Sequence, residues 1–387
     1  MRRFLLAFLF VALPLAAQTS YVIERIDVSA SRVRPAIIRA ETRLVAGRAY
    51  TAEQLDQAVY RVRRLPFVVD ATYALEPGSG PDARVLRVSV VDQPMFNYDF
   101  DVQGIGVRGG YAYSNTGLGL RFFPAPTGVL DLDAGGQQFS NGNGSAAGHF
   151  GDLSVQYTAY GLFGTSAYAG AGISTRYEAN ERLVSPMFLL GIPLTQTQTV
   201  RASYQRFGTE DENSDLLTAQ WMYETTDDPY FGRRGLSIAA GPQIQKIRYH
   251  EIFNPGTRFQ FTVDDRSKST GFVVDAAKYW PWHEHSTLWV RGNQQFLKYT
   301  GVNNGRPKLD ENYRYGDYLA GAGHNFDFGR GVDDFHRLRL ELAVGYHLDH
   351  SSTRLFSSDR SGGEVFTGLA YRSRIGVFRL GLSYVER

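Results

Sequence analysis

The chain has 387 residues and a formal net charge of +2, from 41 lysine and arginine residues against 39 aspartate and glutamate residues. This balance gives no broad positive potential that would attract nucleic acid, so the charge does not favour a nucleic-acid-binding protein. The chain has no cysteine, which excludes disulfides, thiolate metal sites and a lipid attached to an N-terminal cysteine. Its 41 glycines, 23 tyrosines and 25 phenylalanines suit many short strands joined by turns.

The first residues have the features of a secretory signal. Arg2 and Arg3 precede an apolar run over residues 4–13, and small residues follow it. The run is too short to cross a bilayer as a helix, whereas a basic start, a short apolar core and a small-residue exit are typical of a signal peptide. We therefore expect a signal peptide at 1–17, with cleavage after Ala17. No later segment has eighteen consecutive apolar residues, so an exported periplasmic protein, a secreted protein and an outer-membrane barrel remain.

Residues 21–93 have the pattern of a small α/β domain. A strand-like segment at its start is followed by two helical segments. The first opens at Pro35, where the missing N–H costs nothing, and stops at Gly47, a residue type common just past helix ends. The second begins at Thr51, and a glutamine three residues later completes a capping box.

The apolar period then changes from helical to two. Alternating segments at 67–75 and 83–92 flank a Gly-Ser-Gly-Pro-Asp turn at 78–82. The order is strand, helix, helix, strand, strand (βααββ), and we expect both helices to cover one face of a three-stranded sheet. Because no serine, histidine or paired acids cluster here, we predict a binding or structural module.

This order, with AGRAYT between the helices and RRLPFVVDATYAL after the second, resembles a polypeptide-transport-associated (POTRA) domain. The resemblance covers nearly all of residues 21–93. It implies a periplasmic domain that binds passing polypeptides by pairing an extended segment with a sheet edge, because exposed edge strands have unpaired N–H and C=O groups. We expect the free edge at Tyr21–Ser29 or Ala83–Val91. The alternative is a domain that only spaces or steadies its neighbour.

From residue 95 to residue 387 apolar and polar positions alternate. The clearest segments are 153–160, 200–207, 217–224, 259–263 and 338–348. A secreted β-sandwich, propeller or β-helix would alternate too, but the export signal, the length of the region and the charged polar faces favour an antiparallel transmembrane β-barrel with a wet lumen. About eight strands precede residue 227 and seven or eight follow it, which predicts a barrel of about 16 strands.

The string DDPYFGRRG (227–235) separates these two halves. No histidine or nucleophile lies close to it in sequence and alternation resumes at once, so we interpret it as a turn that starts a strand, not as an acidic catalytic loop. It resembles the motif acidic-Asp-Pro-x-Phe-Pro-Thr-Arg-Gly, found midway through barrels of the outer-membrane assembly superfamily (BamA/TamA-like proteins, or bacterial surface antigen barrels). The matching residues are Asp227, Asp228, Pro229, Phe231, Arg234 and Gly235. Gly232 and Arg233 replace the proline and threonine.

A single POTRA domain before such a barrel is similar to the POTRA-barrel part of patatin-like autotransporters. The resemblance implies a protein of the bacterial outer membrane with the POTRA domain in the periplasm. Its expected partners are outer-membrane lipid, a polypeptide client that the barrel helps to insert or export, and periplasmic accessory proteins. We expect no enzymatic activity, nucleotide, nucleic acid, metal or cofactor.

One departure from the family pattern supports a second hypothesis, a passive channel or structural barrel that has lost transport activity. Transporting members of the superfamily carry a Val-Arg-Gly-aromatic motif on a loop inside the lumen. Here Val-Arg-Gly occurs only at 107–109 and at 290–292, the latter inside a predicted strand. In addition, either Val377–Tyr384 is the closing strand or the last strand is absent, which leaves barrel closure open.

Overall fold

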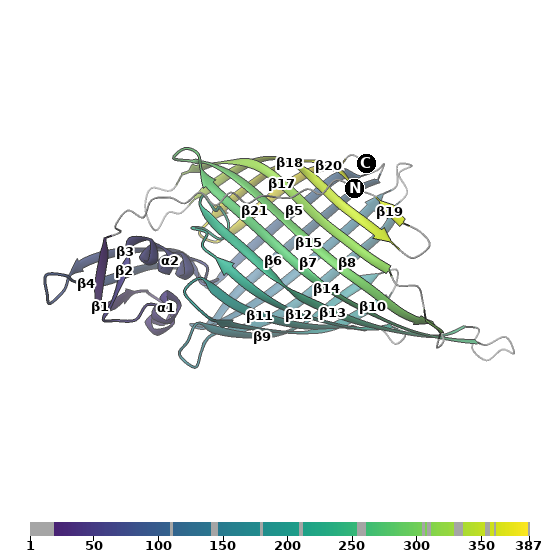
Figure 1. Ribbon diagram of the computed structural model, residues 1–387, viewed down its shortest axis with the longest axis horizontal. Helices are drawn as coiled ribbons and strands as arrows, with labels where there is room; N and C mark the ends of the chain where they lie inside the picture. The colour runs from purple at the N-terminus through teal and green to yellow at the C-terminus, as the bar shows by residue number, and fades with distance from the viewer. Residues whose placement is uncertain are drawn as a thin grey trace, which may run out of the picture.

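The computed structural model contains a small α/β module and a closed β-barrel (Figure 1). It describes residues 19–108, 111–140, 146–178, 181–208, 212–253, 261–303, 306–307, 311–328, 336–352, 357–359 and 361–385. The signal peptide expected at 1–17 lies outside these residues. In the described part of the chain, no helix has both the length and the apolar character needed to cross a membrane.

The module has one strand more than the sequence predicted. Its elements are β1 (Ser20–Ser29), α1 (Pro35–Thr42), β2 (Arg48–Thr51), α2 (Ala52–Arg63), β3 (Val68–Pro77) and β4 (Ala83–Asp92). The extra strand β2 has four residues, too few to show an alternating pattern. The observed order is therefore βαβαββ rather than βααββ, and the sheet has four strands.

The extra strand also changes which edges are free. The strand order is β2-β1-β4-β3, with β1 parallel to β4 and antiparallel to β2. Both segments that we expected at the edge are therefore central strands, and that prediction is wrong. The edges of the sheet are β2 and β3.

The two helices start as predicted, but the first ends earlier. The Thr51 hydroxyl accepts a hydrogen bond from the Gln54 N–H at 3.3 Å, and the Gln54 side chain accepts one from the Thr51 N–H at 2.9 Å, which confirms the capping box. Helix α1 ends at Thr42 because Arg43 adopts a left-handed conformation with φ of 53°. Gly47 also has a positive φ of 82°, but it lies at the entry to β2.

Fifteen long strands close the barrel in the described part of the chain. They are β5 (Phe96–Arg108), β6 (Tyr111–Ala125), β7 (Gly128–Ser140), β8 (Ala146–Leu162), β9 (Ala167–Glu178), β10 (Glu181–Pro193), β11 (Gln198–Gly208), β12 (Glu212–Glu224), β13 (Gly235–Phe253), β14 (Phe261–Pro281), β15 (Ser286–Asn303), β17 (Glu311–Asp327), β18 (Arg337–Ser352), β20 (Gly362–Ser373) and β21 (Gly376–Val385). Two short strands, β16 (Arg306–Pro307) and β19 (Ser357–Asp359), pair antiparallel with the ends of β15 and β18. Eight long strands precede residue 227 and seven follow it.

The barrel closes through a parallel junction, whereas the sequence predicted antiparallel pairing throughout. Strand β21 pairs with β5 in parallel along its whole length, because an odd number of up-and-down strands brings the first and last to the same direction. Across this junction the Phe100 and Phe378 rings stack with centroids 5.3 Å apart, and Arg379 lies 2.9 Å from Asp99. The predicted closing strand is thus present and the wall is closed.

The two faces of the barrel wall differ as the alternation predicts. On β18 the side chains of Leu340, Leu342 and Val344 are 45%, 67% and 63% exposed on the outside, whereas Arg339 and His347 are each 2% exposed on the inside. Other strands show the same outward row of exposed apolar side chains: Leu153, Val155, Tyr157, Phe188, Leu190, Ile192, Leu217, Trp221, Leu288 and Val290. An apolar surface of this extent requires an apolar surrounding.

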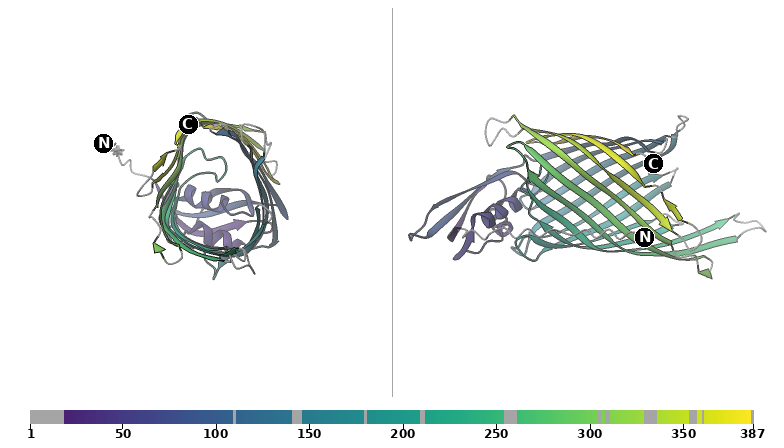
Figure 2. Two further views of the ribbon diagram at one scale, coloured as in Figure 1. Left: turned by 90° about the vertical axis from the view of Figure 1, so that its right-hand side faces the viewer. Right: turned by 45° about the horizontal axis from the view of Figure 1, so that its top comes forward.

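The module lies across one opening of the barrel (Figure 2, left). Its hydrophobic core continues into the barrel wall, since the core cluster includes Phe123 of β6 and Val129 of β7 together with Leu55 of α2. Phe67 of the module meets Tyr160 of β8 edge to face, with ring centroids 5.6 Å apart. This continuous packing fixes the module against the barrel mouth.

Candidate functional site

The motif predicted at 227–235 begins in a segment that folds into the lumen. This segment, residues 225–234 between β12 and β13, is called the inner segment below. It extends inside the wall when the barrel is viewed along its axis (Figure 2, left). Asp227 Oδ1 accepts hydrogen bonds from the backbone N–H groups of Arg233 at 2.8 Å and Arg234 at 3.2 Å, which closes the segment on itself. The motif therefore precedes strand β13, as predicted, but it belongs to a longer segment inside the lumen instead of a short turn.

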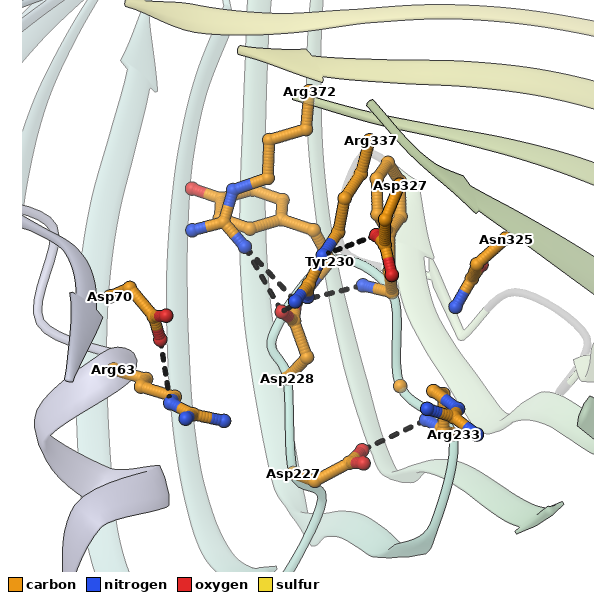
Figure 3. A network of polar contacts seen from close by, with 12 residues as sticks. Arg63, Asp70, Asp227, Asp228, Tyr230, Arg233, Asn325, Asp327, Arg337 and Arg372 are labelled. Carbon is orange, nitrogen blue, oxygen red and sulfur yellow. Dashed lines mark hydrogen bonds and ion pairs between the residues drawn. The ribbon is translucent and has the colours of Figure 1, made fainter. Parts of the chain in front are cut away.

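Asp228 joins the inner segment to the barrel wall (Figure 3). Its carboxylate accepts hydrogen bonds from the N–H groups of Tyr230 at 2.8 Å and Phe231 at 2.9 Å. Arg372 of β20 lies 3.1 Å from this carboxylate, and Arg337 of β18 lies 3.3 Å from it. Burial alone would raise the pKa of Asp228, but the Arg372 charge, the N–H groups and the Arg337 charge together hold the pKa below its usual value. Asp228 is therefore ionised in its buried position.

Arg372 also reaches the module. Its Nη2 donates a hydrogen bond to the backbone oxygen of Val69 on β3 at 2.8 Å, and its guanidinium lies 4.7 Å from the centre of the Tyr230 ring. Nearby, Arg339 of β18 donates to the backbone oxygen of Gly232 at 3.1 Å. The buried Arg372 guanidinium thus links three parts of the molecule: the inner segment, strand β20 and the α/β module.

The remaining motif residues have separate places. Arg234 points to helix α2, where it contacts the Tyr60 hydroxyl and lies 3.5 Å from Asp56. Phe231 is 1% exposed, and Pro229 borders a lumenal cavity of about 330 Å³. Gly235 has a φ of 111°, and a Cβ there would lie 2.4 Å from the Thr225 backbone oxygen. The conformation of the segment thus requires glycine at this position.

The sequence did not predict the arginines that hold the motif. Arg337, Arg339 and Arg372 lie more than 100 residues beyond Asp228. Strand alternation already placed Arg339 on the lumenal face. Alternation along β20 does not reveal which residue Arg372 contacts, because it specifies only the face of the wall. The burial of Asp228, which requires basic partners, became visible only in the structure.

The two edges of the module sheet differ in how they are covered. On β3 the backbone oxygens of Val69 and Ala71 accept hydrogen bonds from Arg372 and Arg63, both at 2.8 Å. Strand β2 instead borders a groove of about 670 Å³ between the module and the barrel rim. The groove is lined on the module by Ala40, Arg43, Val45, Arg48, Ala49, Tyr50 and Gln54, and on the rim by Gly164, Thr165, Ser166, Pro193, Leu194, Thr195 and Gln196.

Comparisons with known proteins find only a weak likeness to solved structures. No protein-family profile matches the sequence, and no curated protein matches it. Among solved structures, BamA from Haemophilus ducreyi lacking POTRA domains 1–3 is similar, with 11% identity, a TM-score of 0.37, and coverage of 94% of this chain and 80% of that one. CdiB from Acinetobacter baumannii has 8% identity, a TM-score of 0.37 and coverage of 94% and 74%. The siderophore receptor PirA from Pseudomonas aeruginosa has 9% identity, a TM-score of 0.23 and coverage of 77% and 80%.

The class of the protein therefore follows from its own fold: a closed β-barrel with an apolar outer face and an α/β module docked at one opening. The site that this fold presents is the junction between module and barrel, which combines the inner segment and the groove along β2. Among the described residues, no group of three or more histidine, aspartate or glutamate side chains is arranged to hold a metal ion.

Proposed function

We propose that the chain is an outer-membrane β-barrel whose periplasmic module binds an extended polypeptide client by strand addition and whose barrel aids the insertion or export of that client. The observation that carries the proposal is a sheet edge beside a groove at the mouth of the barrel. The apolar outer face supports a membrane location, because lipid is the surrounding that such a face needs.

Strand β2 is the edge that we assign to the client. On β3, guanidinium groups already occupy two of the backbone oxygens that a new strand would need. Along β2 the groove leaves room for an extended segment between the strand and the barrel rim. Main-chain hydrogen bonds would supply affinity with little dependence on client sequence.

Photo-crosslinking tests this assignment directly. Ala49 on β2 and Ala74 on β3 are both exposed alanines on edge strands, so they form a matched pair of positions for a photoreactive residue. An unfolded β-barrel client should crosslink from position 49 and not from position 74. Equal yields from the two positions, or no crosslink from position 49, would contradict strand addition at β2.

The second hypothesis, a passive channel, rests on the missing loop motif. The Val-Arg-Gly at 290–292 lies within β15, where the Arg291 guanidinium lies 4.3 Å from the centre of the Trp289 ring as part of the wall. Reconstitution in liposomes separates the hypotheses. Faster insertion of an unfolded client supports the assembly function, whereas steady ion conductance with no effect on the client supports the channel.

A further inference from the structure

A second cavity, of about 340 Å³, lies between the module and the lumenal face of the barrel. Helix α2 and the end of α1 form one side of it, and strands β8 to β12 form the other. Its lining includes four arginines, Arg43, Arg61, Arg64 and Arg201, and two glutamates, Glu41 and Glu224. With every group ionised, these side chains have a net charge of +2.

Two of the arginines contact Glu41. Arg43 lies 3.6 Å from its carboxylate, and Arg61 donates to its backbone oxygen at 3.1 Å. Arg64 lies 3.4 Å from Glu224. Burial lowers the pKa of the Arg61 guanidinium, and the Arg43 charge lowers it further, because positive charges are concentrated here.

These arginines have unused donors. Within the described structure, Arg61 Nη1 and Arg64 Nε are buried and have no hydrogen-bond partner, and the Arg61 residue as a whole is 4% exposed. A buried donor without a partner is unfavourable, and more so when the group is charged. The cluster therefore lacks negative charge and acceptor oxygens.

We propose that this cavity binds a small phosphate-type oxyanion, which bridges the module and the barrel. Guanidinium groups present planar pairs of N–H donors that match the oxygens of phosphate and sulfate groups. Tyr160, Tyr168 and Leu189 on the barrel side complete the lining of this cavity. Because Arg64 comes from the module and Arg201 from β11, a bound anion would stabilise the docked position of the module.

Sulfate is the suitable first probe, because it stays a dianion between pH 6 and pH 8. Titration calorimetry of the full chain in detergent micelles, at constant ionic strength set with chloride, should show saturable binding at one site. Arg64→Gln and Arg201→Gln remove a charge from opposite sides of the cavity, and each should weaken binding by about tenfold or more. Arg87→Gln is the matched control, because Arg87 on β4 is exposed and pairs with Glu76 on β3.

Glu41 provides an independent test. Burial raises the pKa of Glu41 to about 7, although Arg43, Arg61 and Arg64 oppose this rise. Tyr160, Tyr168, Arg201 and Glu224 of the barrel line the same cavity as Glu41. Sulfate binding should therefore weaken from pH 6 to pH 8 in the wild type and stay nearly constant in Glu41→Gln.

Two further probes distinguish the source of the anion. Glycerol phosphate in micelles represents a soluble ligand, and phosphatidic acid in nanodiscs represents a lipid headgroup; competition by either against sulfate supports the site and identifies its source. The proposal is overturned if sulfate shows no saturable binding. It is also overturned if Arg87→Gln weakens binding as much as Arg64→Gln and Arg201→Gln do.

Discussion

The ion pair between Asp228 and Arg372 should contribute strongly to the stability of the folded protein. Their side chains are 9% and 3% exposed and lie 3.1 Å apart. Removing one member of a buried ion pair leaves the other charge uncompensated and typically costs about 3–5 kcal/mol. Here each retains a second partner, Arg337 for Asp228 and the Val69 backbone oxygen for Arg372, so we expect about 3 kcal/mol for Asp228→Asn or Arg372→Gln.

A double-mutant cycle isolates the pair itself. Urea unfolding of the protein in detergent micelles, followed by tryptophan fluorescence, should give a coupling energy of about 2 kcal/mol between positions 228 and 372. Hydrogen exchange at the backbone N–H groups of Tyr230 and Phe231 reports on the inner segment in the same variants. The control pair is Arg87 with Glu76, which are 3.1 Å apart but 53% and 40% exposed, and it should couple by less than about 1 kcal/mol. A coupling at 228 and 372 no larger than in the control would refute the reasoning.

The pH dependence of Asp228 has a defined sign. Because its pKa is lowered in the folded protein, its contribution to stability is present above the ordinary aspartate pKa of about 3.9 and is lost as the pH falls through the folded value. Asp228→Asn should therefore flatten the acid limb of the stability curve below about pH 4. An unchanged acid limb would contradict the ionised, buried state of this carboxylate.

Three further outcomes are expected. Because burial raises the pKa of Glu41 to about 7, its contribution to stability should fall by up to about 3 kcal/mol as the pH rises from 4.5 to 7, and urea titrations should show Glu41→Gln to be more stable than the wild type at pH 8. Gly235→Ala should lower the urea midpoint, because its Cβ would meet a backbone oxygen at 2.4 Å, whereas Gly363→Ala has open space around its Cβ and should not. Arg234→Ala should speed hydrogen exchange in helix α2, which it contacts, whereas Arg25→Ala, at an exposed site on β1, should leave that rate unchanged.

Local patterns in the sequence were sufficient for much of the fold. A side-chain period of two identifies a strand whatever its neighbours are, so the lumenal and outer faces of β18 followed from residues 338–348 alone. The capping box at Thr51 and Gln54 involves atoms three residues apart, and it formed as predicted. The division of the barrel strands at residue 227 was also a local signal, because a proline and glycines interrupt the period of two there.

The features that define the site depended on contacts between distant segments. Strand β2 is recognisable only through its pairing with β1, and that pairing moved the free edges of the sheet. The odd number of strands, and with it the parallel junction of β21 with β5, emerged only when the barrel closed. Likewise, Asp228 meets Arg372 because a curved wall brings strand β20 to the inner segment across 144 residues of sequence. Alternation states which face a side chain occupies but not which segment lies opposite, since that is decided by the register and closure of the whole sheet.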